Sequence, residues 1–193
     1  MSTKREDWFN AALPLLKERV FMPEGLKVPD NVRIGVGTLS SRSGKSNSTN
    51  IGVCFPAERS ESNTIEIFIS PELDESNRVL DVVCHELIHA IDGNENGHKG
   101  PFRTMALAIG LEGKMTSTTA SERLNGTLSE IVKEIGEYPH EKLDTTRQKK
   151  QGTRMLKMEC SECGWNFRTN KTQLAAMTIN TCLSCQGDTL ELA

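Results

Sequence analysis

Long apolar segments are missing from this chain, and their absence excludes several classes of protein. The 193 residues contain no run of about 18 apolar residues, so the sequence offers no candidate transmembrane helix. The first residues, Met1 to Asp7, lack the apolar core of a secretory signal peptide. We therefore expect a protein that is not secreted, has no membrane partner, and is intracellular (cytoplasmic, or nuclear in a eukaryote).

Aromatic residues and an excess of one charge are also scarce. Aromatic residues make up 5% of the chain, so the core has to rest on Leu, Ile, Val, Met and Ala. The formal net charge of −3 argues against a protein that coats nucleic acid through bulk positive charge. The length allows one ordinary domain, or a domain with a small appendage. The placement of the six cysteines and four histidines is more informative.

The cysteines form one dense cluster near the end of the sequence. A C-x2-C pair, 18 intervening residues and a second C-x2-C pair comprise Cys160, Cys163, Cys182 and Cys185. This spacing is typical of a four-cysteine zinc site, in which two turns complete one tetrahedron. Two disulfides are the alternative, and they require an oxidising compartment. Cys54 and Cys84 lie elsewhere, and we expect them to be small buried hydrophobic residues.

The segment around these cysteines has the pattern of a zinc ribbon. Residues 155–160, 164–169 and 189–192 are short enough and sufficiently alternating to form three strands. About 40 residues bury too little surface to fold alone, so the metal should supply much of the folding free energy. Trp165 and Phe167 are expected to form the small core, with stacking on nucleic-acid bases as the alternative.

Three of the histidines lie within 14 positions. His85 and His89 are four residues apart, which places them on one face of a helix, and Glu86 follows the first. In the pattern H-E-x-x-H, both imidazoles bind one zinc ion and the glutamate acts as general base toward the zinc-bound water. Apolar residues at helical spacing predict a helix over residues 76–92, capped by Asp74 or Ser76 and ended by Gly93.

A catalytic zinc ion usually takes three protein ligands and keeps one position open. His98 is the preferred third ligand, because glycines at 93, 97 and 100 allow a tight reversal and Pro101 suits the start of a helix through about Ile109. Glu95 and Glu112 are alternative ligands, and Asp92 is a candidate hydrogen-bond partner for a ligand imidazole.

The segments His85-Glu-Leu-Ile-His89-Ala and Gly97-His-Lys-Gly-Pro-Phe102, followed by the four cysteines, resemble the SprT-like metalloprotease family, which includes the DNA-dependent protease Spartan. The loop at 40–44, Ser-Ser-Arg-Ser-Gly, looks like the Ser-Arg-x-Gly segment of that family, without the Trp often found there. The resemblance implies a zinc metalloprotease domain with a zinc ribbon, and protein substrates that are bound or cross-linked to DNA.

The remaining pattern predicts an α+β fold, in which a small antiparallel or mixed sheet packs on helices that carry the H-E-x-x-H zinc site, with a β zinc ribbon after it. Strands are expected at 32–36, 50–54 and 64–69. Helices are expected at 6–20, with Pro14 as a kink or break, and at 118–135. Residues 136–154 have the composition of a linker, in which Tyr138 and His140 are weak candidates for the oxyanion stabiliser.

These observations divide the chain into a SprT-like metalloprotease domain at 1–146, a basic linker at 147–154 and a four-cysteine ribbon at 155–193. The stretch from residue 147 to 157, which leads into the ribbon, contains five basic residues and no acidic residue. These five are candidate nucleic-acid contacts: Arg147, Lys149, Lys150, Arg154 and Lys157. A charged, solvated linker is the equally weighted alternative. The oligomeric state does not follow from the sequence.

The sequence thus predicts a zinc-dependent endopeptidase with two zinc ions per chain, one catalytic and one structural. Zinc-bound water attacks a peptide carbonyl, and Glu86 accepts its proton. Two rival hypotheses stay open. One is a non-enzymatic DNA-binding or regulatory protein with a residual His site. The other is a metal-dependent hydrolase of a non-peptide substrate.

Overall fold

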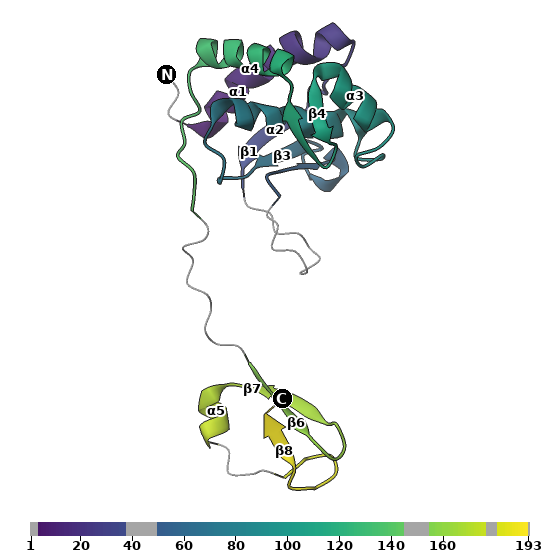
Figure 1. Ribbon diagram of the computed structural model, residues 1–193, viewed down its shortest axis with the longest axis vertical. Helices are drawn as coiled ribbons and strands as arrows, with labels where there is room; N and C mark the ends of the chain where they lie inside the picture. Colours follow the sequence, from purple (N-terminus) through teal and green to yellow (C-terminus); the bar gives the residue numbers. More distant parts are fainter. Residues whose placement is uncertain (1–3, 38–49, 145–154, 177–180, 193) are drawn as a thin grey trace. The chain divides into compact units, whose positions relative to one another are not determined.

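A computed structural model of the chain describes residues 4–37, 50–144, 155–176 and 181–192. The chain divides into two compact units, Met1–Thr145 and Thr146–Ala193, and each mixes helices with small sheets (Figure 1). The expected α+β class is confirmed at this level. Within the described ranges, no helix has the length and apolar composition needed to cross a membrane.

The first unit is built around a three-stranded sheet. Its strands are β1 (Val32–Val36), β2 (Gly52–Phe55) and β3 (Ile65–Ile69), in the order β1-β3-β2. The central strand β3 runs parallel to β1 and antiparallel to β2, so the sheet is mixed and β2 forms one edge. The three strands expected from the sequence are confirmed. Alternate residues of β3 are buried, as a sheet with one covered face requires.

Helix α2 (Ser76–Asp92) covers the inner face of this sheet and is the most buried element of the unit. Twelve of its residues are buried, including Leu80, Val83, Leu87 and Ile88. The predicted bounds and the predicted end are confirmed, since Gly93 adopts a left-handed conformation with φ of 65°. The expected cap is wrong: the Glu75 carboxylate, and neither Asp74 nor Ser76, accepts the backbone N–H groups of Asn77 and Arg78.

The first helix, α1 (Arg5–Leu16), runs through Pro14 without a break. A π-helical turn, η1 (Lys17–Phe21), and a 3-10 turn, η2 (Met22–Glu24), follow it. Proline removes one hydrogen bond from a helix and crowds the preceding turn, and the wider π turn begins three residues after Pro14. Trp8, Phe9 and Leu16 of α1 lie in the core. A short 3-10 turn, η3 (Ala57–Arg59), follows β2.

Helix α3 (Pro101–Ile109) begins and ends as the sequence predicts, and a hairpin follows it. The hairpin pairs β4 (Leu111–Lys114) with β5 (Ser117–Ala120) in antiparallel register. The predicted helix from residue 118 is therefore wrong at its start. Helix α4 (Glu122–Ile135) begins after Ser121, whose hydroxyl caps the backbone N–H of Leu124. Ala120, the apolar residue of β5, continues the helical spacing of Leu124 and Leu128 on α4, which concealed the strand.

Residues 136–144 pack on the first unit, so the predicted linker does not begin at residue 136. The Trp8 indole N–H donates to the Gly136 carbonyl at 2.8 Å. Tyr138 is buried, with its ring 5.0 Å from that of Trp8, and the backbone N–H of Leu143 donates to Pro71 O. His140 Nε2 lies 3.1 Å from Pro71 O. Tyr138 and His140 thus serve packing, away from the three histidines of the motif.

The second unit contains strands β6 (Leu156–Cys160), β7 (Asn166–Thr169) and β8 (Leu190–Leu192) in one sheet of order β7-β6-β8. These are the three strands expected for the ribbon segment. Both neighbours pair antiparallel with β6. A short helix, α5 (Lys171–Ala176), was not anticipated. The rings of Trp165 and Phe167 lie 5.4 Å apart and are half-buried, while Met158, Cys160 and Cys182 are the buried apolar residues of this unit.

Candidate functional site

Three histidines gather at one side of α2. His85 Nε2 and His89 Nε2 each lie 3.2 Å from His98 Nε2. All three ligand atoms fall within 4.8 Å of one another, which is an arrangement that could hold a metal ion. His85 and His89 come from successive turns of one helix, as their spacing predicts. The structure therefore brings together the three histidines that sequence reasoning selected.

The loop between α2 and α3 returns His98 to the helix face. Gly93, Asn94, Gly97 and Gly100 all adopt positive φ values, which reverse the chain within eight residues. Asn94 Nδ2 donates to the Cys54 carbonyl at 3.0 Å, and this bond ties the loop to edge strand β2. The loop that carries His98 is thus anchored to the sheet.

Two neighbours orient the imidazoles. His85 Nδ1 lies 2.9 Å from Thr118 Oγ1 on β5, so the outer nitrogen has a hydrogen-bond partner and the inner one faces the other histidines. The buried ring of Phe102 packs against all three imidazoles, with centroid separations of 4.4–5.0 Å. His89 Nδ1 is buried and has no hydrogen-bond partner among the described residues. Sequence reasoning gave Thr118 no role, because it was assigned to a helix.

Burial keeps the imidazoles neutral. Burial, together with the neighbouring imidazoles of His89 and His98, lowers the pKa of His85 to about 3. Burial likewise lowers the pKa of His89 to about 4, and that of His98 below its usual value. A neutral imidazole with a free nitrogen lone pair is the form that binds a metal ion.

Glu86 lies beside the histidines on α2 and is buried, with 6% of its surface exposed. Desolvation raises the pKa of this carboxyl to about 8, because the apolar surroundings disfavour the charged form. The backbone of Gly52 on β2 closes over the carboxylate: a Cβ at that position would lie 2.5 Å from Glu86 Oε1. A carboxyl whose pKa lies this close to neutral pH is suited to exchange protons.

These groups line a cleft of about 390 Å³. One wall is β2 and the preceding residues 50–51; the other comprises the β4–β5 turn and β5, with hydroxyls from Thr116, Ser117 and Thr118. A larger hollow of about 780 Å³ lies elsewhere on the first unit, lined by residues such as Arg33, Phe55 and Phe68. The described residues that line this hollow include no histidine or cysteine, so the candidate metal-binding histidines belong to the smaller cleft.

The alternative ligands do not join the histidine group. Glu95 and Glu112 are exposed, and neither appears with the three histidines among the described metal-ligating clusters. Asp92 accepts hydrogen bonds from the backbone and side-chain nitrogens of Asn96, and so stabilises the loop. Cys54 and Cys84 are buried, as predicted, and burial raises the pKa of both thiols.

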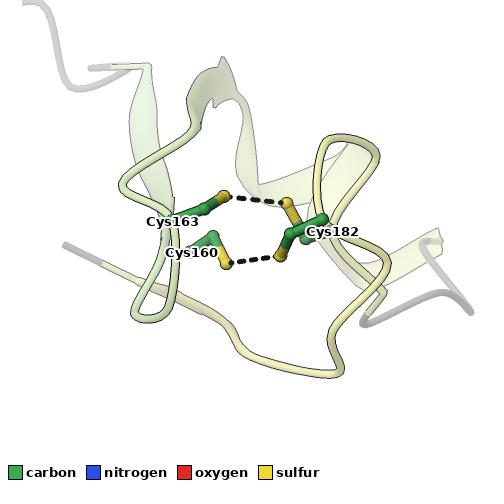
Figure 2. A group of neighbouring side chains, drawn as sticks. Cys160, Cys163 and Cys182 are labelled. Atoms are coloured by element: carbon green, nitrogen blue, oxygen red, sulfur yellow. Dashed lines mark hydrogen bonds between the residues drawn. The ribbon is translucent and has the colours of Figure 1, made fainter.

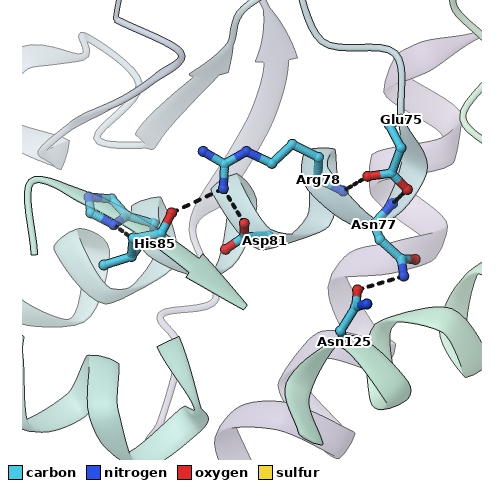
Figure 3. Close-up of polar contacts among 7 residues, drawn as sticks. Glu75, Asn77, Arg78, Asp81, His85 and Asn125 are labelled. Carbon is cyan, nitrogen blue, oxygen red and sulfur yellow. Dashed lines mark hydrogen bonds and ion pairs between the residues drawn. The ribbon is translucent and has the colours of Figure 1, made fainter. Parts of the chain in front are cut away.

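An ion pair adjoins the cleft (Figure 3). Arg78 Nη1 donates to the buried carboxylate of Asp81 and, at 3.0 Å, to the Thr118 carbonyl. Thr118 thus contacts Arg78 through its backbone and His85 through its side chain. Arg78 lines the cleft together with the histidines. Sequence reasoning missed it, although its position two helical turns before His85 is a signal that could have found it.

The four clustered cysteines form a second group in the ribbon unit (Figure 2). Cys160 and Cys185 Sγ atoms lie 3.6 Å apart, as do those of Cys163 and Cys182, and all four atoms fall within 4.8 Å. These separations are well beyond a disulfide bond of about 2.05 Å, and all four thiols are free. The Thr189 hydroxyl, 3.1 Å from Cys160 Sγ, helps lower the pKa of that thiol to about 6.

Four of the five candidate nucleic-acid contacts, Arg147, Lys149, Lys150 and Arg154, lie outside the described residues. Lys157 is described: it lies on β6 and pairs with the Glu159 carboxylate. The predicted linker at 147–154 and the loop at 40–44 also lie outside the described residues.

Comparison of the chain with protein-family models, curated proteins and solved structures gives no match. The two clusters and the residues around them are therefore the features of the chain that point to a function.

Proposed function

We propose that this chain is a zinc-dependent endopeptidase of SprT-like type, with a catalytic zinc ion at His85, His89 and His98 and a structural zinc ion in the ribbon. The observation that carries the proposal is the grouping of three neutral imidazoles beside a buried carboxyl in one cleft. A closed structural site has no need of an adjacent general base, whereas a hydrolytic site does.

The spacing of the donor atoms supports zinc. Tetrahedral geometry with zinc–nitrogen bonds of about 2.0–2.1 Å places ligand nitrogens about 3.3 Å apart, and two pairs of Nε2 atoms here are 3.2 Å apart. Zinc–sulfur bonds of about 2.3 Å place sulfurs about 3.8 Å apart, and the paired Sγ atoms are 3.6 Å apart. Both donor sets suit zinc in type and in spacing.

When bound, zinc supplies a Lewis acid that polarises a carbonyl and acidifies a water molecule. The protein supplies the rest of the chemistry. Glu86, held under the backbone of Gly52, accepts a proton from the attacking water and delivers it to the leaving amine. Thr118 fixes the ring of His85, and Phe102 excludes water from the side of the imidazoles that it covers.

The test is a cleavage assay on a protein bound to DNA, with and without the DNA, comparing the wild type with Glu86→Gln. Glutamine preserves the size of the side chain and removes the base, so we expect unchanged metal content and loss of proteolysis by about 10²-fold or more. Unchanged cleavage by this variant would refute the mechanism. The DNA arm tests the substrate class that the sequence resemblance implies.

Metal analysis is the companion measurement. We expect two zinc ions per chain in the wild type and one after replacement of both His85 and His89 by alanine. Salt-dependent DNA binding without peptidase activity, with or without DNA present, would instead favour the non-enzymatic DNA-binding alternative. Hydrolysis of a small ester or amide without any peptide cleavage would favour the non-peptide hydrolase.

A further inference from the structure

Arg78 lines the cleft but has no role in the proposed mechanism. Its side chain is partly buried, with 29% exposed, and it lines the cleft with His85, Glu86 and His98. Asp81 and the Thr118 carbonyl hold one end of the guanidinium through Nη1. Nε and Nη2 have no partner in the part of the chain that the structure describes, and the second terminal nitrogen points away from Asp81 (Figure 3).

Charge in the cleft is otherwise sparse. Among the described residues that line it, Arg78 is the single arginine or lysine, and Glu86 is the single carboxylate. Apart from the histidines and Cys54, the other polar side chains that line the cleft are uncharged: Asn50, Asn94, Thr116, Ser117 and Thr118. A guanidinium that is anchored at one end and open at the other loses little conformational entropy when it binds a planar anion.

The position of Arg78 sets an upper limit on the distance from the reacting bond. Arg78 and His85 are seven residues apart on α2, about 10.5 Å along the helix axis, and Arg78 Nη1 and His85 Nδ1 both contact Thr118, through its carbonyl and its hydroxyl. Both project from the same helical face into the cleft. An extended peptide rises about 3.3 Å per residue, so the open end of the guanidinium lies within about three residues of substrate from the reacting bond.

We propose that Arg78 binds a carboxylate on the substrate chain, within about three residues of the scissile bond, and thereby makes this cleft selective for acidic segments. The proposal rests on the proposed peptidase function for its account of the scissile bond. The carboxylate comes from an Asp or Glu side chain, or from the C-terminus of the substrate.

The experiment uses fluorogenic decapeptides in which one glutamate is moved along an otherwise neutral sequence, each paired with its glutamine counterpart. A second set, amidated or free at the C-terminus, distinguishes the two sources of carboxylate. For the wild type we expect kcat/KM to favour glutamate about tenfold at one position within about three residues of the cleaved bond and little elsewhere. In Arg78→Gln the ratio should fall to about one.

A purely structural role for Arg78 predicts a different result. Loss of its support for Thr118 would slow cleavage of glutamate and glutamine peptides alike and leave their ratio unchanged. The double variant Arg78→Gln, Asp81→Asn guards against misfolding, because it removes both charges of the pair together. Arg33→Gln is the matched control, since Arg33 lies on β1 in the other hollow, and it should keep the wild-type ratio.

Binding to the Glu86→Gln variant separates this inference from the proposed function. Anisotropy of the same peptides should show about tenfold tighter binding of the glutamate member, lost in Glu86→Gln, Arg78→Gln. Such binding without cleavage by the wild type would refute the peptidase and support the role of Arg78. Equal binding of both members, or a preference that survives the loss of Arg78, would overturn the inference whether or not the peptides are cleaved.

Discussion

Replacing Gly52 by alanine tests how Glu86, the proposed general base, is held in place. An alanine Cβ would lie 2.5 Å from Glu86 Oε1 and 2.6 Å from Val82 Cγ1, closer than such atoms approach in folded proteins. Val82 is buried and branched at Cβ, so it has little freedom to move. The carboxyl of Glu86 therefore has to leave its position under β2.

Two magnitudes follow from this clash. Overpacking of a core by one methyl group typically costs about 1–3 kcal/mol of unfolding free energy. Displacement of a catalytic group by about 1 Å typically lowers the rate by about 10²-fold. We expect Gly52→Ala to lose about that factor in kcat/KM, while all three histidines keep their positions and the zinc content stays at two per chain.

The assay measures peptide cleavage, zinc content and denaturant unfolding for Gly52→Ala beside Gly35→Ala. Gly35 lies on β1 of the same sheet, and a Cβ there would meet only the Phe68 ring at 3.8 Å, an ordinary contact. The control should therefore retain activity. Wild-type kcat/KM in a folded, zinc-loaded Gly52→Ala protein would show that Glu86 does not act from the position described here.

Two further predictions concern the histidine site. Thr118→Val keeps the shape of the side chain but removes the partner of His85 Nδ1, so the affinity for zinc should fall about 10–100-fold in chelator competition, whereas Thr116→Val should leave it unchanged. In the metal-free protein, the histidines and Glu86 should change the free energy of unfolding in opposite directions as the pH falls. Folded-state pKa values of His85 and His89 below 6.5 remove stability as the pH falls from about 6.5 toward 4, and a raised pKa at Glu86 adds stability as the pH falls from about 8 toward 4.5. Metal-free Glu86→Gln should therefore lose more stability than the metal-free wild type between pH 7.5 and 5.5, by on the order of 2 kcal/mol in denaturant titrations; an equal loss in both proteins would contradict the opposing titrations.

The sequence predicted best those parts that depend on local spacing. His85 and His89 share a helix face because they are four residues apart, Gly93 ends that helix because glycine tolerates a positive φ, and Pro101 begins the next one. The paired cysteines likewise converge through two short turns. Each of these features is decided by a few neighbouring residues.

The parts that were missed depend on contacts between distant segments. Thr118 reaches His85 only because the β4–β5 hairpin folds against α2, and the weak alternation of that hairpin did not identify it as two strands. Gly52 matters through its closeness to Glu86, which no pattern in strand β2 indicates. Tyr138 was assigned to a linker because its neighbours are polar, yet its ring packs on Trp8 from the far end of the unit's sequence.

Each candidate ligand set occupies a short stretch of the sequence, so the two sets are synthesised one after the other. The last histidine of the first group is residue 98 and the last cysteine of the second is residue 185, so 185 − 98 = 87 residues separate the completion of the two sets. At about 5–20 residues per second, the ribosome adds those residues in roughly 4–17 seconds. The three histidines are thus synthesised, and their partner Thr118 follows 20 residues later, before any of the four clustered cysteines exists.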